Sequence, residues 1–449
     1  MAPQVVVDEV VELTLEAQRY GARLLRLSER SAAPLSGAQY EVLMAHEGRL
    51  GLLDLRITAE LDGSRWLHAG NRVGSYRFIG VDSAEVLVQV DPKVESADVF
   101  RMLDRANRAV TMASEETDLP VGDQPISGVF LLFFARRVSA FLRRNRFRSY
   151  RFIEESSPSR VKGRPLIEQY ALQNVPRGRA HILPTRHVDL SSNVFENQVI
   201  AYAVLVATRL AQLLGLENSE ALRNELQTCT RLLVGVDPRR VTSGEVRAHR
   251  LSRATKHFRP VHDLCLVLLE NQSVMLDAGE RIPFAAFSLN MPNLFERYVR
   301  AVFATTFGPL FVGRKNQLEY PTGFGGKPIK LDGLMVKGTR RVVVEAKYRT
   351  LDETDDVLVL GKVPERHVYQ TVAYASHELV RASKAIIVYP TWDPNGPPIR
   401  LSDPIDDFGW TRFGERHLEL RLVGVDLGAS FQRLVDETGP RLSPLMDST

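Results

Sequence analysis

The sequence predicts an α/β protein of three parts: a β-rich N-terminal module over residues 1–125, a helical middle region over 126–282, and a C-terminal domain over 283–449 in which helices flank a mixed sheet. Three observations lead to this prediction. The length of 449 residues exceeds that of a typical single domain. The hydrophobic pattern changes from the period of strands to that of helices near residue 126. The last third predicts a helix, a strand pair, a second helix and a further strand.

The N-terminal module is predicted from a pair of strands. Two runs rich in β-branched and aromatic residues, Ser75–Val81 and Glu85–Val90, flank a turn at Asp82–Ser83. This pattern is typical of an antiparallel pair. The polar residues of the module form no cluster that suggests catalysis, so we expect a binding module, for a partner protein or for nucleic acid.

The middle region combines apolar helices with basic runs. Helical periodicity is clear in Val129–Leu142, Phe195–Leu214 and Val261–Glu270. The segment 136–151 carries seven arginines among sixteen residues, interleaved with aromatic side chains. Such a run suits contacts to nucleic-acid phosphates and stacking on bases. The alternative is a solvated helix end and a loop that pairs with acidic groups elsewhere. The candidate contacts to nucleic acid are Arg143, Arg144, Arg146 and Arg148, together with Lys347 in the last third of the chain.

The composition argues against several classes of protein. Apolar residues make up 44% and charged residues 25%, which is ordinary for a globular protein. The formal net charge of +4 permits nucleic-acid binding without requiring it. The two cysteines, Cys229 and Cys265, argue against a disulfide scaffold and have no zinc-type spacing. We see neither a signal peptide nor an uncharged run of membrane-spanning length, so we expect a cytoplasmic protein with no membrane association.

The last third contains a predicted hairpin that brings two carboxylates together. Gly338-Thr339 separates two apolar strands, and a glycine in the first position of a two-residue loop is typical of a type II′ turn. Counting outward from this turn places Asp332 directly opposite Glu345. Strand alternation places Lys347 on the same face as Glu345. Like charges directly opposite each other repel. A divalent cation between the two carboxylates would explain the pair.

An aspartate opposite Glu345-Ala346-Lys347 has the form of the PD-(D/E)XK nuclease motif. Phosphodiester hydrolysis needs a hard cation held by oxygen ligands, which polarises the phosphoryl group and lowers the pKa of the attacking water. We therefore expect Asp332, Glu345 and the carbonyl of Ala346 to bind Mg²⁺, with Mn²⁺ as a substitute. Lys347 supplies a positive charge near the nucleophile or the developing charge. The alternative is an exposed hairpin face with ordinary charges, since this short pattern also arises by chance.

The segment that follows the hairpin predicts a helix that supports the motif. The helix covers His367–Ala375, and it places Gln370 and Tyr374 on one face at a spacing of four residues. We expect Gln370 to brace the site and Tyr374 to pack beneath it. An apolar strand, Lys384–Pro390, comes next.

The segment that precedes the hairpin predicts an amphipathic helix over Asn293–Phe303. Glu296 lies three residues after Asn293. One interpretation makes Glu296 the partner of Asn293 in a capping box. The other makes it an additional catalytic residue that contacts the metal or the water.

These segments together resemble the McrC family, the nuclease subunit of the McrBC modification-dependent restriction systems. Weaker similarity extends upstream to about Gly80. Glu345 is a departure, since aspartate is frequent there in the family, but either carboxylate binds a metal. The segments that carry the resemblance most strongly are Asn293–Glu296, Leu331–Gly333, Val344–Tyr348 and Tyr369–Ala375.

The resemblance implies a PD-(D/E)XK endonuclease domain over residues 283–449 that cuts DNA with Mg²⁺. It also implies a partner, a McrB-type AAA+ GTPase ring that translocates on DNA and recognises modified cytosine. By the same analogy, residues 1–125 dock on this ring and stimulate its GTP hydrolysis. Two alternatives stay open. One is a DNA-binding or assembly subunit that does not cut, and the other is a nuclease of another defence or repair system with a different AAA+ ATPase.

Overall fold

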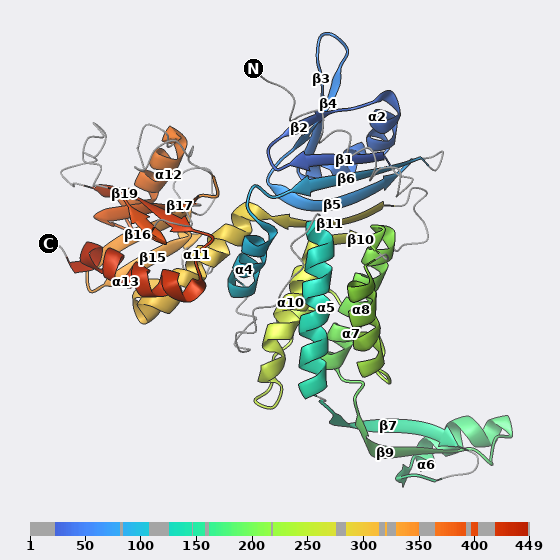
Figure 1. Cartoon of the computed structure of the whole chain (residues 1–449). Coiled ribbons are helices and arrows are strands. Elements are labelled where there is room, and N and C mark those ends of the chain that lie inside the picture. Colours follow the sequence, from blue (N-terminus) through green and yellow to red (C-terminus); the bar gives the residue numbers. More distant parts are fainter. Residues whose placement is uncertain are drawn as a thin grey trace. The chain divides into compact units, whose positions relative to one another are not determined.

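The computed structural model of the chain shows an α/β architecture, as predicted (Figure 1). It divides into two compact units. The first covers Met1–Val129 and Met275–Thr449, and the second covers Phe130–Val274. The boundaries predicted at residues 125 and 282 stay predictions. The structure describes residues 23–80, 84–106, 125–145, 147–157, 161–216, 219–274, 284–313, 319–320, 329–349, 364–391, 397–402 and 418–447.

The first unit contains a sheet that combines strands from both ends of the sequence. Strand β1 runs parallel to β6, and β5 runs antiparallel to both β6 and β11. The predicted strand pair is thereby confirmed, while its turn at residues 81–83 lies outside the described residues. Gly74 of β5 leaves room for close pairing, because a Cβ there would meet the carbonyl oxygen of Phe287 at 2.0 Å. The strands that the first unit contributes have the order β1 (Arg23–Ser28), β6 (Glu85–Asp91), β5 (Arg72–Ile79) and β11 (Phe284–Asn290).

A smaller sheet and short helices accompany this sheet. The small sheet has the order β2 (Ala32–Pro34), β4 (Arg65–Ala69), β3 (Leu55–Ala59). Helix α2 begins after Ser36, which forms a reciprocal capping box with Gln39. The helical segments are α2 (Gly37–Met44), α3 (Glu47–Leu50), the 3₁₀ turn η1 (Gly51–Leu53) and α4 (Ser96–Ala106).

The C-terminal half of the first unit is built on a mixed sheet. Its strand order is β12 (Phe311–Val312), β15 (Gly333–Lys337), β16 (Arg340–Ala346), β17 (Lys384–Thr391), β19 (Glu419–Asp426), β18 (Ile399–Leu401). Strands β15 and β16 form the predicted antiparallel hairpin, whereas β16, β17 and β19 are parallel. Parallel strands are covered on both faces, which explains the continuous apolar run of β17. The remaining elements are α11 (Met291–Phe307), η6 (Gly308–Leu310), β13 (Glu319–Tyr320), β14 (Ile329–Lys330), α12 (Glu365–Ser376) and α13 (Phe431–Asp447).

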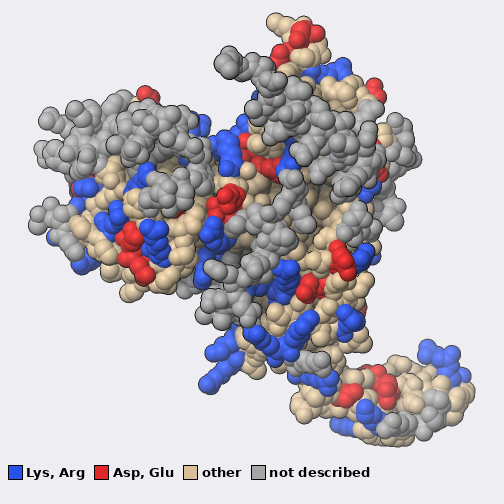
Figure 2. Space-filling view, viewed as in Figure 1, with Lys and Arg blue, Asp and Glu red and all other residues tan. Residues whose placement is uncertain are grey.

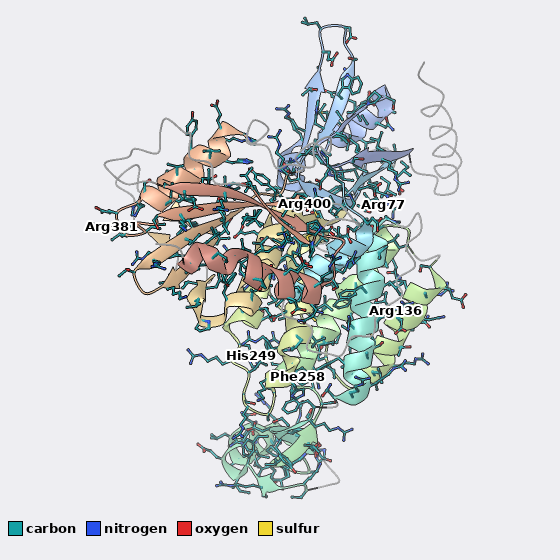
Figure 3. All side chains as sticks on the ribbon, turned by 60° about the vertical axis from the view of Figure 1, so that its left-hand side comes forward. Arg77, Arg136, His249, Phe258, Arg381 and Arg400 are labelled. Carbon is teal, nitrogen blue, oxygen red and sulfur yellow. The ribbon has the colours of Figure 1, made fainter. Side chains whose placement is uncertain are left out.

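The second unit contains a helical bundle (Figure 1). Phe258 lies in its core (Figure 3). The centroid of the Phe258 ring is 4.9 Å from that of the Phe141 ring and 5.7 Å from that of the Phe147 ring. Both cysteines are buried and unpaired. In the part of the chain that the structure describes, no helix has the length and hydropathy to cross a membrane. The bundle contains α5 (Ile126–Arg144), α7 (Phe195–Leu213), α8 (Glu220–Leu232), α9 (Ser243–Ala248), η5 (Lys256–Phe258) and α10 (Arg259–Asn271), and the short strand β10 (Gln272–Val274) follows α10.

A β-ribbon extends from the end of this bundle (Figure 1). Strands β7 (Ser149–Ser157) and β9 (Leu183–Ser191) are antiparallel, and β8 (Arg164–Pro165) pairs with β9. Short helical turns follow β8: α6 (Ile167–Gln169), η2 (Tyr170–Asn174) and η3 (Val175–Arg177). The sequence-based description of the middle region as helical with basic stretches did not include this ribbon. The reason is that Tyr150 and Phe152 are exposed, so the apolar pattern of β7 marks no core face.

Candidate active site

The hairpin of β15 and β16 has the predicted register, with Lys337 paired to Arg340 next to the turn. Gly338 has φ +63°, as the first position of a type II′ turn requires. Asp332 lies one residue beyond the last pair of the ladder. Its Oδ2 accepts the backbone N–H of Ala346 over 2.9 Å. This hydrogen bond holds the Asp332 carboxylate against the end of β16.

Glu345 is almost completely buried beside this contact, with a side chain 3% exposed. Its Oε1 lies 2.7 Å from Nζ of Lys347, so the two side chains share a face as predicted. Among the residues that the structure describes, no donor reaches Oε2 of Glu345. Burial raises the pKa of the Glu345 carboxyl, and the charge of Lys347 opposes that effect. A buried carboxylate oxygen without a donor is costly, and a bound cation would compensate for it.

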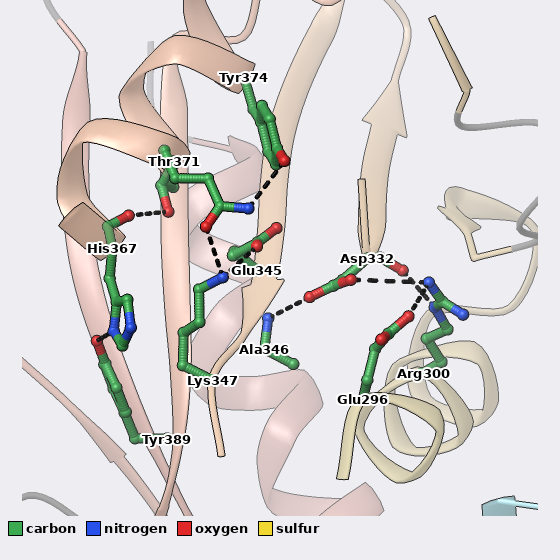
Figure 4. A network of polar contacts seen from close by, with 11 residues as sticks. Glu296, Arg300, Asp332, Glu345, Ala346, Lys347, His367, Thr371, Tyr374 and Tyr389 are labelled. Carbon is green, nitrogen blue, oxygen red and sulfur yellow. Dashed lines mark hydrogen bonds and ion pairs between the residues drawn. The ribbon is translucent and has the colours of Figure 1, made fainter. Parts of the chain in front are cut away.

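Lys347 is held from the other side by helix α12 (Figure 4). Its Nζ donates to Oε1 of Gln370 over 2.8 Å. Nε2 of Gln370 in turn donates to the hydroxyl of Tyr374 over 2.8 Å. Tyr374 packs against the apolar core between α12 and the sheet. The chain of contacts therefore fixes the Lys347 ammonium, and it joins residues that the sequence predicted to act together.

Glu296 does not form the capping box that one interpretation assigned to it. Helix α11 begins at Met291, and its N-cap is Asn290, whose side chain accepts the backbone N–H of Asn293 over 2.9 Å. Asn293 is therefore inside the helix, and the capping-box interpretation is wrong. Glu296 lies one turn further along and forms an ion pair with Arg300.

Arg300 is a site residue that the sequence reasoning missed. Its Nε donates to the backbone oxygen of Asp332 over 2.6 Å, and its Nη2 lies 3.8 Å from Oδ1 of the same residue. It thus connects Glu296 of α11 to Asp332 (Figure 4). The available signal, which the sequence reasoning did not use, is the spacing of four residues between Glu296 and Arg300 on a predicted helix.

The site carries more negative than positive charge around Asp332. Burial, followed by the charges of Glu345 and Glu296, raises the pKa of Asp332 to about 8. The N–H of Ala346 and the charge of Arg300 only partly oppose this. Oxygen donors in a negatively charged pocket fit a hard divalent cation. The side chains described in the structure form no group of three or more His, Cys, Asp and Glu suited to a metal. The predicted donors are two carboxylates and one carbonyl, a small set of the kind that Mg²⁺ supplements with water.

His367 of α12 borders the site on its far side (Figure 4). Its Nδ1 lies 3.1 Å from the hydroxyl of Tyr389 in β17. Burial, and then the charge of Lys347, lower the pKa of His367 to about 4. His367 is therefore neutral near pH 7 and adds no positive charge beside Lys347. Nothing in its sequence spacing indicated this position.

The basic residues predicted to contact nucleic acid belong to the second unit. Arg143 and Arg144 are exposed at the end of α5, and Arg148 is exposed just before β7. Arg146 lies outside the described residues. Figure 2 shows Lys and Arg side chains gathered at the end of the bundle from which the ribbon extends. The role of these arginines in binding DNA stays a prediction.

The chain resembles known proteins along most of its length. The sequence model of the family described as McrBC 5-methylcytosine restriction system component matches residues 67–390. No curated protein matches the chain. A chain in the refined half-complex from the tetradecameric assembly of Thermococcus gammatolerans McrB AAA+ hexamers with bound McrC has a similar fold, with a TM-score of 0.60 and 17% identity, over 93% of this chain and 100% of that chain. A chain in the cryo-EM structure of the Thermococcus gammatolerans McrBC complex matches with a TM-score of 0.42 and 16% identity, over 64% of this chain and 88% of that chain.

Proposed function

Because this chain belongs to the family of McrBC 5-methylcytosine restriction system components, we propose that it is the DNA-cutting subunit of a McrBC-like restriction complex. It hydrolyses phosphodiester bonds with Mg²⁺, or with Mn²⁺ in its place, through a C-terminal PD-(D/E)XK nuclease domain. The observation that carries this proposal is one connected set of contacts. Asp332 bonds to the strand that bears Glu345 and Lys347, and Gln370 holds Lys347 from the next helix.

Asp332, Glu345 and the carbonyl of Ala346 would hold the metal. The ion, when bound, polarises the phosphoryl group and lowers the pKa of the attacking water. Two features support this assignment: the buried Oε2 of Glu345 that no described donor reaches, and the raised pKa of Asp332. Both indicate that the protein alone does not balance the negative charge that it has buried.

Lys347 orients the water and stabilises the charge that develops on the phosphate. Its contacts to Glu345 and Gln370 place its ammonium before the substrate arrives, which avoids a reorganisation cost during the reaction. Glu296 is an additional contact to the metal or the water. Arg300 fixes it in place and holds the backbone of Asp332 at the same time.

Nucleotide hydrolysis is carried out by a partner protein. We assign this role to a McrB-type AAA+ GTPase ring, whose GTP hydrolysis this subunit stimulates and on which residues 1–125 dock. The similar structure from Thermococcus gammatolerans, which is described as McrB AAA+ hexamers with bound McrC, supports the assignment. The matched chain is covered over its full length.

Plasmid cleavage in Mg²⁺ tests the proposal. The reactions contain methylated or unmethylated plasmid, with and without a McrB-type AAA+ protein, and with GTP or ATP. Asp332→Ala removes a proposed metal ligand. Asp436→Ala is the matched control, because Asp436 is exposed on α13 and bonds only to a neighbouring helix residue in the described contacts.

We expect cutting of methylated plasmid by the full mixture with GTP, loss of cutting in Asp332→Ala, and wild-type cutting in Asp436→Ala. Cutting that needs ATP rather than GTP would assign the chain to another defence or repair system. If wild type fails to cut in every mixture but still assembles with its partner and stimulates GTP hydrolysis, the chain is an assembly subunit without nuclease activity.

A further inference from the structure

The first unit contains a contact between its N-terminal half and the end of the candidate catalytic strand. Arg30, in the turn between β1 and β2, donates from Nη2 to the backbone oxygen of Tyr348 over 3.0 Å. Tyr348 directly follows Lys347 in the sequence. The two contacting residues are 318 positions apart, so this contact ties together distant parts of the chain.

The same guanidinium also reaches the start of helix α11 through one intermediate. Nε of Arg30 donates to Oδ1 of Asn71 over 2.7 Å. The backbone oxygen of Asn71 accepts the N–H of Met291, the first residue of α11, over 3.1 Å. Helix α11 carries Glu296 and Arg300. Arg30 thus contacts the end of the strand that carries Lys347 directly, and it contacts the start of α11 through Asn71.

The backbone of Arg30 has the left-handed conformation, with φ +58°. Residues with a side chain seldom adopt this conformation, and they cluster where the surrounding structure needs it. Here the backbone N–H of Arg30 donates to the backbone carbonyl of Gly70 over 3.0 Å. The backbone N–H of Glu29 donates to the backbone carbonyl of Asp91 over 2.9 Å. These bonds fix the turn on the N-terminal sheet and aim the guanidinium at Tyr348.

Tyr348 is held on its side chain as well as on its backbone. Its ring is buried and lies 5.9 Å, centroid to centroid, from the ring of Phe295 in α11. Its hydroxyl lies 3.5 Å from Oε2 of the buried Glu29, the neighbour of Arg30. The backbone and side chain of Tyr348 therefore both meet the turn at residues 29–30.

We infer that Arg30 is a positioning residue for the nuclease site: it sets the strand end that carries Lys347 relative to helix α11, and so makes the site depend on the N-terminal half of the chain. This inference rests on the proposed function, because it assigns to Lys347 and α11 the roles given there. A planar guanidinium suits the task, since it donates to Asn71 and Tyr348 from two fixed directions.

Two variants of Arg30 and one control test the inference in the full chain. Arg30→Ala removes both contacts and leaves no buried cavity, because Arg30 is exposed. Arg30→Lys keeps the positive charge but loses the planar guanidinium, whose Nε and Nη2 donate to two different acceptors. Arg26→Ala is the control, because Arg26 lies on the adjoining strand β1 and forms an ion pair of 2.5 Å with Asp91.

Backbone hydrogen exchange, followed by mass spectrometry, is the readout that does not depend on activity. We expect Arg30→Ala to accelerate exchange in residues 341–349 and at the start of α11, Arg30→Lys to have an intermediate effect, and Arg26→Ala to leave both segments as in wild type. Unchanged exchange in both segments of Arg30→Ala would overturn the inference, whatever the activity. Faster exchange throughout the first unit would overturn it too, because that result indicates a general loss of stability.

The second readout is the kinetics of plasmid cutting. The reactions contain the chain, its AAA+ partner, the nucleotide that the partner uses, and Mg²⁺. We expect kcat of Arg30→Ala to fall about 10- to 100-fold, with KM for plasmid within about 2-fold of wild type, and with partial recovery in Arg30→Lys. An unchanged kcat in Arg30→Ala would contradict the positioning role. If wild type itself does not cut, the proposed nuclease function fails, and the exchange measurement alone decides whether Arg30 positions these segments.

Discussion

Ala346 donates its backbone N–H to Oδ2 of Asp332 over 2.9 Å, and this bond joins the two arms of the hairpin just beyond Gly333–Val344, the last pair of their ladder. The contact orients a carboxylate that burial and neighbouring acids make costly to ionise. The site thus combines a fixed geometry with an unfavourable charge, a combination typical of functional sites.

Asp332→Asn is expected to separate activity from stability. It keeps the shape of the side chain and an acceptor for Ala346, but it removes the charge. Loss of a metal ligand costs several kcal/mol of transition-state stabilisation, so cutting is expected to fall about 1000-fold or more. Without metal at pH 8, the Asp332→Asn variant is expected to unfold at a higher temperature than wild type. The pKa of Asp332 is raised from 3.8 to about 8, so ionisation of the aspartate destabilises the wild-type fold at this pH, whereas asparagine carries no charge. Thermal unfolding without metal measures this, and a lower unfolding temperature at pH 8 would contradict it.

Magnesium is expected to stabilise the folded chain. A ligand that binds only the folded state at 100 times its Kd adds about 2.7 kcal/mol to the free energy of unfolding. The unfolding temperature of wild type is therefore expected to rise with Mg²⁺ concentration, and that of Asp332→Asn and Glu345→Gln is expected to stay constant. Differential scanning fluorimetry with Mg²⁺, and with Na⁺ at matched ionic strength, checks this. An equal rise in all three proteins would place the cation elsewhere.

The Lys347–Gln370–Tyr374 chain is expected to give graded losses. Lys347→Ala removes the ammonium and should lower cutting about 100-fold or more. Gln370→Leu removes an acceptor of Lys347 but keeps the charge, so a loss of about 10-fold is expected. Tyr374→Phe removes only the partner of Nε2 of Gln370 and should cost less than Gln370→Leu. Plasmid cleavage under single-turnover conditions ranks the three, and a larger loss in Tyr374→Phe than in Lys347→Ala would refute this order.

Glu29→Gln is expected to stabilise the protein at alkaline pH. Burial raises the pKa of Glu29 from 4.5 to about 7, so the wild-type carboxyl contributes its full stability below pH 4.5 and loses it as the pH rises through 7. Glutamine carries no charge, and at pH 8 the variant should gain about 3 kcal/mol in the free energy of unfolding. Urea unfolding at pH 4.5 and pH 8 tests this. A gain of equal size at both values would rule out ionisation as the cause.

The exposed arginines near the end of α5 are expected to contribute to DNA binding through phosphates. Replacing Arg143, Arg144 and Arg148 by alanine should weaken binding to any sequence alike. The slope of log K against log salt should decrease by about 0.9 for each phosphate that the variant no longer neutralises. Fluorescence anisotropy with duplex DNA at several salt concentrations measures it. An unchanged slope would assign this surface to something other than DNA.

Much of the site followed from local sequence signals. The hairpin register followed from the turn at Gly338-Thr339, and the pairing of Gln370 with Tyr374 followed from helical spacing. Such features depend on residues close in sequence. The contact between Arg30 and Tyr348 has no local signal, because it spans 318 positions.

The start of helix α11 shows why a local signal also misleads. Asn290 and Asn293 both suit an N-cap, and Glu296 three residues after Asn293 completes a capping-box pattern. The helix begins earlier because a proline, Pro292, lies in its first turn, where its missing N–H costs nothing. Glu296 therefore does not cap the helix and pairs with Arg300 instead. Arg300 also contacts Asp332, so Glu296 belongs to the candidate site.

Strand β11 passes directly into helix α11, since Asn290 is both the last residue of the strand and the N-cap of the helix. One piece of backbone therefore belongs to the N-terminal sheet and to the wall of the candidate site. A recombination event that joined this nuclease half to a foreign N-terminal half before β11, at residue 284, would place β11 beside a strand other than its own β5. An N-terminal fragment that ended before β11 would leave β5 with an open edge, which invites aggregation. A cut after β11 has its own cost, because it separates helix α11 from its N-cap, Asn290.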